Sequence, residues 1–147
     1  MKFSFSLESL LQLRTQLEEQ KQLEYQQVVQ EWQQAQEQKQ QWIRKQQKGF
    51  KKWRQQTKSK STIAQWKKYN FYFQRLHQEI QKTTQFCIQL EQKVEIKRAE
   101  LLEAVKQRKM IETLKEKAFE DFKKEEQRKE QQMVDELVTS RYYHHPS

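Results

Sequence analysis

Apolar residues recur every seven positions in the second half of a chain that is otherwise strongly polar. If Trp66 is given heptad position a, the successive a positions are Trp66, Phe73, Ile80, Cys87, Val94 and Leu101. The matching d positions are Tyr69, Leu76, Thr83, Leu90, Lys97, Ala104, Ile111 and Ala118. Apolar a and d positions form the seam of a left-handed coiled coil, so the pattern predicts a helix from about Thr62 to about Ser140.

The first half carries a weaker repeat. Leu7, Val28, Ala35 and Trp42 share one heptad position, and Leu10 and Leu17 share its partner position. Polar residues interrupt the second series at Glu24, Glu31 and Gln38. We therefore expect a first helix over about residues 6–56, capped by Ser6, with a loosely packed middle.

A polar Ser/Thr-rich segment at about residues 57–61 separates the two patterns. Thr62 and Gln65 have the spacing of a capping box, which marks the start of the second helix. Gly49 is either the end of the first helix or a soft point within it. Two helices joined by a short bend predict an all-α fold, a long two-helix antiparallel coiled-coil hairpin. Residues 1–147 should form a single elongated unit with a disordered tail at 141–147.

The two predicted helices are unequal in length. With the bend near residue 59, Leu7 should lie level with about residue 111 of the second helix. The chain beyond about residue 112 is then expected to be a single-helix overhang. It carries the apolar residues Phe119, Phe122, Met133, Val134, Leu137 and Val138, which need a partner to cover them.

Composition supports helices and argues against a catalytic centre. The 147 residues include 28 Gln but one Gly and one Pro, so turns and Gly-rich phosphate loops are not expected. One Cys and three His give no zinc-ligand spacing, and Cys87 should be a packed thiol at a seam position. We expect no enzyme, no metal, no cofactor, no small-molecule substrate and no membrane span, in a reducing compartment.

The net charge of +9 is concentrated around the bend. Residues 38–78 contain twelve Lys or Arg and no Asp or Glu. The basic bend comprises Lys48, Lys51, Lys52, Arg54, Lys58 and Lys60. It is either a solvated face or a surface for an acidic protein, lipid head groups or nucleic acid. Phe71 and Tyr72 fall off the seam, where they either pack at its rim or bind a partner.

The chain resembles the FliJ family of the bacterial flagellar type III export apparatus over nearly its whole length. The resemblance lies in residues 3–14 (FSFSLESLLQLR), in residues 23–27 (LEYQQ), in the series Trp66, Tyr69, Tyr72 and Leu76, and in residues 112–117 (ETLKEK) running to Asp135-Glu136. Residues 38–49 depart from the family's aromatic pattern at Trp42, Lys45 and Gly49.

The resemblance implies a non-enzymatic stalk that inserts into and stimulates the hexameric flagellar export ATPase. It also implies contacts with the membrane export gate protein and with export chaperones, at the inner face of the cell membrane, with peripheral membrane association only. On this reading the ATPase-facing residues are Leu10, Leu13, Leu17, Phe119, Phe122, Met133 and Leu137. The gate-facing residues are Phe71, Tyr72 and Leu76. The alternative is a coiled-coil arm that binds nucleic acid through the basic bend. The interleaving of the seam with the basic residues and the lack of an accompanying globular domain argue against that partner.

Overall fold

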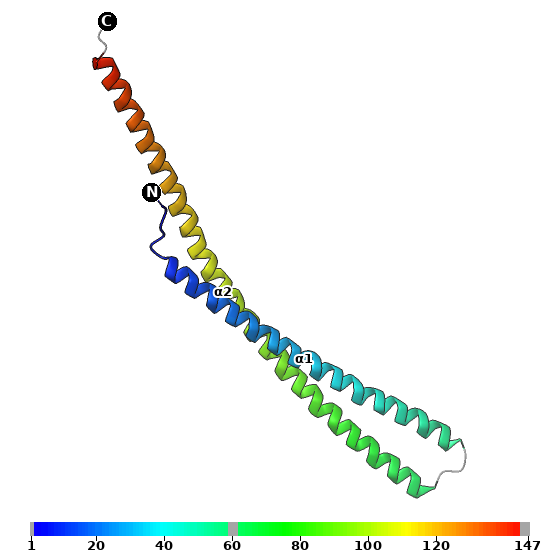
Figure 1. Cartoon of the computed structure of the whole chain (residues 1–147). Coiled ribbons are helices and arrows are strands. Elements are labelled where there is room, and N and C mark those ends of the chain that lie inside the picture. Colours follow the sequence, from blue (N-terminus) through cyan, green and yellow to red (C-terminus); the bar gives the residue numbers. More distant parts are fainter. Residues whose placement is uncertain (1, 59–61, 145–147) are drawn as a thin grey trace. The chain divides into compact units, whose positions relative to one another are not determined.

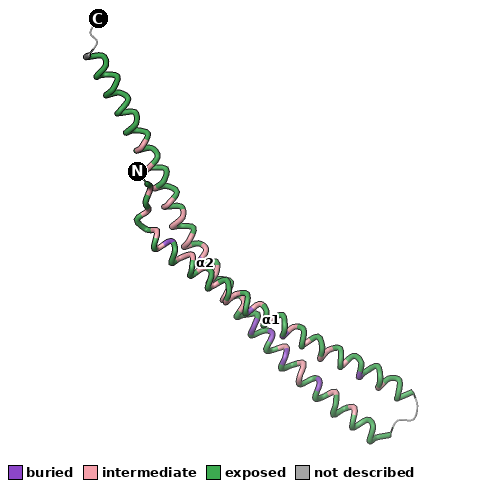
Figure 2. Tube along the Cα trace, viewed as in Figure 1, coloured by how far each residue is buried: buried purple, intermediate pink, exposed green. Residues whose placement is uncertain are grey.

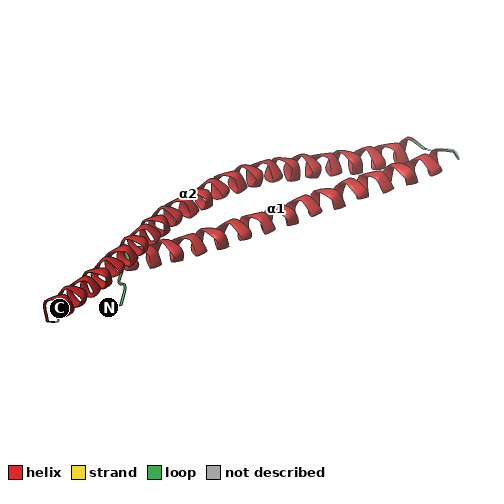
Figure 3. Ribbon diagram, turned by 90° about the horizontal axis from the view of Figure 1, so that it is seen from above, coloured by secondary structure: helices red, strands yellow, loops and turns green. Residues whose placement is uncertain are grey.

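The computed structural model describes residues 2–58 and 62–144, with side chains as far as Tyr143. In these ranges the chain forms two helices, α1 (Glu8–Thr57) and α2 (Ile63–His144), and no strand (Figure 1, Figure 3). The helices are 50 and 82 residues long and pack against each other in antiparallel directions. The predicted all-α helical hairpin is therefore confirmed.

Local hydrogen bonds explain where the helices begin. The backbone N–H of Glu8 donates to the carbonyl of Phe5 at 3.2 Å, so α1 begins two residues after Ser6. At the start of α2 the Gln65 N–H donates to Thr62 Oγ1 at 3.3 Å, and the Thr62 N–H donates to Gln65 Oε1 at 3.4 Å. This reciprocal pair is the predicted capping box. Helix α2 includes residues 141–144 of the expected tail, and residues 145–147 lie outside the described part.

Contacts between α1 and α2 divide the chain into two units, each of which contains part of both helices. Unit 1 comprises Met1–Glu19 and Leu102–Ser147, and unit 2 comprises Gln20–Leu101. Within each unit the α1 residues lie alongside α2 residues that are distant in sequence.

The heptad series read from α2 matches its burial. Buried residues include Leu76, Thr83, Cys87, Leu90 and Ala104, all of them predicted a or d positions. Trp66 is the exception, because 55% of its surface is exposed. It lies in the first turn of α2, where α1 ends at Thr57 and offers little surface to cover a large indole.

One of the two heptad series predicted for α1 is shifted by one residue. Val28 and Ala35 are buried as expected, but the partner series contains Leu11 and Trp32 rather than Leu10 and Glu31. Seam positions alternate in steps of three and four, and a Leu10-Leu11 pair satisfies either order. The middle of α1 is also not loose. Ala35, Cys87 and Leu90 form a buried cluster there, with Trp32 packed against it.

In unit 1 the helices pair farther along α2 than expected. Glu8 forms an ion pair with Lys115 at 2.8 Å, so the stagger differs from the expected one by about one helical turn. The residues before α1 then lie farther along α2. The centroid of the Phe3 ring lies 5.1 Å from that of Phe119 and 5.4 Å from that of Phe122. Residues 127–143 are all exposed (Figure 2). The uncovered helix therefore begins after Glu126 and not at residue 112.

Candidate interaction surfaces

The described side chains form no recognisable metal or redox centre. Among residues 2–58 and 62–143, no three His, Cys, Asp or Glu side chains lie close enough together to hold a metal ion. Cys87 is 2% exposed and packs against Ala35 and Leu90, as its seam position predicted. No helix in the described part of the chain is both long and apolar enough to cross a bilayer.

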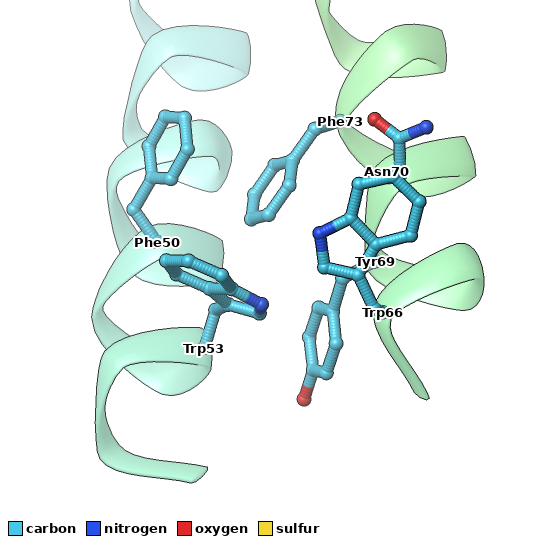
Figure 4. Close-up of a pocket in the computed structure, with 6 residues that line it drawn as sticks. All are labelled: Phe50, Trp53, Trp66, Tyr69, Asn70 and Phe73. Carbon is cyan, nitrogen blue, oxygen red and sulfur yellow. The ribbon is translucent and has the colours of Figure 1, made fainter. Parts of the chain in front are cut away.

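A cluster of aromatic rings fills the seam of unit 2 close to the bend. Phe50 and Trp53 of α1 face Trp66, Tyr69 and Phe73 of α2 (Figure 4). The Phe50 and Phe73 rings are stacked, with centroids 4.3 Å apart and planes 17° apart. The Tyr69 ring follows at 6.2 Å from Phe73. The predicted seam positions Tyr69 and Phe73 are thus partly buried between the helices.

Gly49 is buried inside α1 and faces this cluster. A Cβ atom at this position would lie 3.0 Å from Cε1 of Phe73 and 3.1 Å from Cε1 of Tyr72. Gly49 is therefore neither a helix end nor a turn residue. It continues the heptad series of Val28, Ala35 and Trp42, and its missing side chain leaves room for the two rings.

The basic side chains of the bend lie on the surface. Lys48, Lys51, Lys52, Arg54 and Lys58 are all exposed, and Lys60 lies outside the described residues. Lysines from both helices line a groove of about 590 Å³ in unit 2. Its lining residues are Lys45, Lys48, Gly49, Lys52, Gln56, Gln65, Lys68, Tyr69 and Tyr72.

Tyr72 also lines a neighbouring depression of about 460 Å³, together with Trp42, Lys45, Arg75, Leu76 and Glu79. Of the three residues predicted to face the export gate, Phe71 points outward, Tyr72 is at the rim, and Leu76 is buried in the seam. Trp42, Lys45 and Gly49 of α1 therefore lie beside Tyr72. Trp42 and Gly49 stand one and two heptads after Ala35, which was the available signal that they face α2, whereas Lys45 is exposed.

Four charged residues of unit 2 meet across the seam, around the polar seam positions Lys21 of α1 and Lys97 of α2. Lys97 donates to Glu24 at 3.3 Å and to Glu100 at 3.4 Å, and Lys21 donates to Glu100 at 3.3 Å. Lys21 also pairs with Glu24 at 3.5 Å. The hydrogen bond from Lys97 lowers the pKa of Glu24, and hydrogen bonds from Lys21 and Lys97 lower the pKa of Glu100. The hydrogen bonds to Glu24 and Glu100 raise the pKa of Lys97. The two carboxylates and the two ammonium groups thus meet across the seam, where each partly exposed pair contributes modestly to stability.

Unit 1 carries its own charged contacts along the seam. Arg108 forms an ion pair with Glu18 of α1 and a second one, at 2.7 Å, with Glu112. These hydrogen bonds to Glu18 and Glu112 raise the pKa of Arg108. Arg108 lies one heptad after Leu101, so the apolar a series ends at Leu101 and an ion pair occupies the next a position.

The residues predicted to face the ATPase all belong to unit 1, but they differ in exposure. Leu13 and Leu17 are exposed because Leu11 occupies the seam, whereas Leu10 is half-buried. Phe119 and Phe122 are partly covered by Phe3. Met133 and Leu137 are 63% and 62% exposed, and Val134 and Val138 are exposed beside them.

The family described as flagellar FliJ protein matches residues 2–147. No curated protein and no solved structure gives a significant match. The match covers nearly the whole chain, including both units and the aromatic cluster. The chain therefore belongs to the FliJ family, whose members are components of the flagellar protein export apparatus.

Proposed function

We propose that this chain is a non-enzymatic stalk of the flagellar export apparatus. In this role it inserts into the hexameric export ATPase, stimulates it, and connects it with the membrane export gate and with export chaperones. The protein would work in the cytoplasm at the inner face of the cell membrane. The observation that carries the proposal is the apolar stripe of Met133, Val134, Leu137 and Val138 on a helix that nothing else in the described chain covers.

The spacing of these four residues places them on one side of α2. Residues 133 and 137 are four apart, as are 134 and 138, so each pair is aligned along the helix. Large apolar side chains on a lone helix stay exposed to water until a partner covers them. Met and aromatic residues are common anchors in such interfaces. A narrow single helix with this stripe suits insertion into a pore lined by several subunits.

The N-terminal leucines support the same assignment. Leu13 and Leu17 are exposed, and they belong to the same unit as the apolar stripe. Both termini of the chain therefore contribute apolar surface to one unit. We assign unit 1 to the ATPase, with Leu13, Leu17, Met133 and Leu137 as the main contacts.

We assign the gate contact to unit 2. Tyr72 lies at the rim of a depression that also contains Trp42 and Lys45, which gives it an aromatic and cationic surrounding. Leu76 is buried and would support Tyr72 from beneath rather than contact the gate. Phe71 is exposed on the adjacent surface and extends this area.

The test replaces Met133 and Leu137 together with Ser and measures stimulation of the purified export ATPase. Stimulation should fall at least about tenfold if both side chains become buried on binding, since each would lose about 1 kcal/mol or more. The matched control replaces Leu102 and Met110, an exposed Leu and an exposed Met of the same helix, with Ser. This control should stimulate the ATPase normally. Tyr72→Ala should also stimulate normally but lose binding to the gate protein. Normal stimulation by the Met133/Leu137 variant would refute the assignment.

A further inference from the structure

The hairpin end, defined here as residues 45–58 and 62–73, carries positive charge and contains no Asp or Glu. Four lysines line its groove of about 590 Å³, three from α1 and Lys68 from α2. The α1 lysines, at positions 45, 48 and 52, follow the spacing of one helix face. No carboxylate lines the groove, and no ion pair forms among the described residues between 38 and 78.

The same end exposes large apolar side chains. Ile63 and Trp66 both lie in the first turn of α2 and are 76% and 55% exposed. Phe50 is also exposed at its edge, although its ring is stacked on Phe73. Exposed Ile and Trp side chains on a polar helix are not stabilised by their contact with water. Trp66 lines a smaller depression that shares Gln56, Gln65 and Tyr69 with the lysine groove. Ile63 has the exposed Lys67 one turn later on the same face of α2. Apolar and basic side chains thus lie together at the hairpin end, which suits a partner that is anionic and apolar at once.

The boundary of an anionic bilayer has both properties. Lysine ammonium groups can reach lipid phosphates while their aliphatic stems lie along apolar surface. Tryptophan and tyrosine rings are favoured at the level of the head groups, where one part of the ring is apolar and the other is wet. A nucleic-acid backbone would use the lysines but would leave Ile63 in water. An acidic peptide would fill the groove but has no need of the apolar residues in the first turn of α2.

We propose that the hairpin end binds anionic phospholipid surfaces directly, with lipid phosphates in the lysine groove and with Ile63 and Trp66 at the head-group boundary. This contact requires no other component of the export apparatus. It adjoins the surface assigned to the gate protein, because Lys45 and Tyr72 line both the groove and the neighbouring depression.

The experiment measures cosedimentation of the full chain with vesicles of phosphatidylglycerol and phosphatidylcholine, compared with vesicles of phosphatidylcholine alone. The parent should bind only the anionic vesicles, and binding should weaken as salt is raised. The groove variant Lys48→Glu, Lys52→Glu, Lys68→Glu should bind at least about tenfold more weakly. Trp66→Ser should also weaken binding but retain its salt dependence, because the lysines remain.

The matched control, Lys106→Glu, Lys109→Glu, Lys117→Glu, changes the net charge by the same amount on exposed lysines of α2 outside the hairpin end. It should keep most of the affinity for anionic vesicles. Circular dichroism is measured for each variant to check that it remains helical.

Equal losses in the groove and control variants would overturn the proposal, because binding would then follow net charge alone. Failure of the parent to bind anionic vesicles, with binding to polyglutamate or to duplex DNA instead, would also overturn it and identify the other partner. Neither result would affect the assignment of unit 1, since ATPase stimulation is measured without vesicles.

Discussion

Replacing Gly49 with Ala sets helix propensity directly against packing. In the interior of an exposed helix, Ala is about 1 kcal/mol more favourable than Gly. At position 49, however, the new Cβ would lie 3.0 Å from Phe73 and 3.1 Å from Tyr72, closer than ordinary van der Waals contact. Tyr72 is partly exposed and can turn away. Phe73 is held more firmly, because it stacks on Phe50 at 4.3 Å.

A ring that moves away from Gly49 also moves away from Phe50, the next residue of the same helix. Overpacking of this kind costs about 1–3 kcal/mol. After subtraction of the propensity gain of about 1 kcal/mol, Gly49→Ala should destabilise the hairpin by about 1 kcal/mol. The sign is therefore opposite to the one that propensity alone predicts.

The measurement is urea unfolding followed by far-ultraviolet circular dichroism. Two variants at the exposed position 47, Gln47→Gly and Gln47→Ala, calibrate the Gly-to-Ala difference in the same helix. There the Ala variant should be more stable by about 1 kcal/mol. If Ala stabilises position 49 as much as it stabilises position 47, the Phe73 ring is free to move and the packing role of Gly49 is refuted.

Two further predictions concern the seam. Phe73→Ala should lower the free energy of unfolding by about 2–3 kcal/mol, somewhat less than a fully buried Phe, whereas Phe71→Ala should change it by less than about 0.5 kcal/mol; equal effects in urea unfolding would mean that the heptad assignment is wrong. Glu24→Gln should make the free energy of unfolding less sensitive to acid. The lowered pKa of Glu24 in the folded state stabilises the hairpin above the ordinary pKa of 4.5, and this stabilisation is lost as the pH falls through the lowered pKa of the folded state. Identical acid unfolding curves for parent and variant would show that the ion pair with Lys97 contributes nothing.

Much of the hairpin could be predicted from local patterns. The heptad series beginning at Phe73 identified the buried face of α2 because periodicity reports which side of a helix is apolar. The capping box of Thr62 and Gln65 located the start of α2 within one residue. The basic segment around the bend was likewise visible from charge alone.

The candidate surfaces were only partly predictable. Phe119 and Phe122 were expected to lie on an uncovered helix, but Phe3 covers part of both. That contact depends on the path of the residues before α1, which have no repeat from which to predict it. The apolar pair Met133 and Leu137 remained exposed as expected, because no residue of the described chain reaches so far along α2.

Heptad spacing, the polar bend and the charge distribution were enough to predict two long antiparallel helices, the seam of α2 and the location of the basic charge. Contacts between the helices were needed to learn that Leu11 and not Leu10 faces α2, that Glu8 pairs with Lys115, and that Gly49 makes room for Phe73. Periodicity acts within one helix, whereas the stagger between two helices depends on which side chains and charges fit each other across the seam.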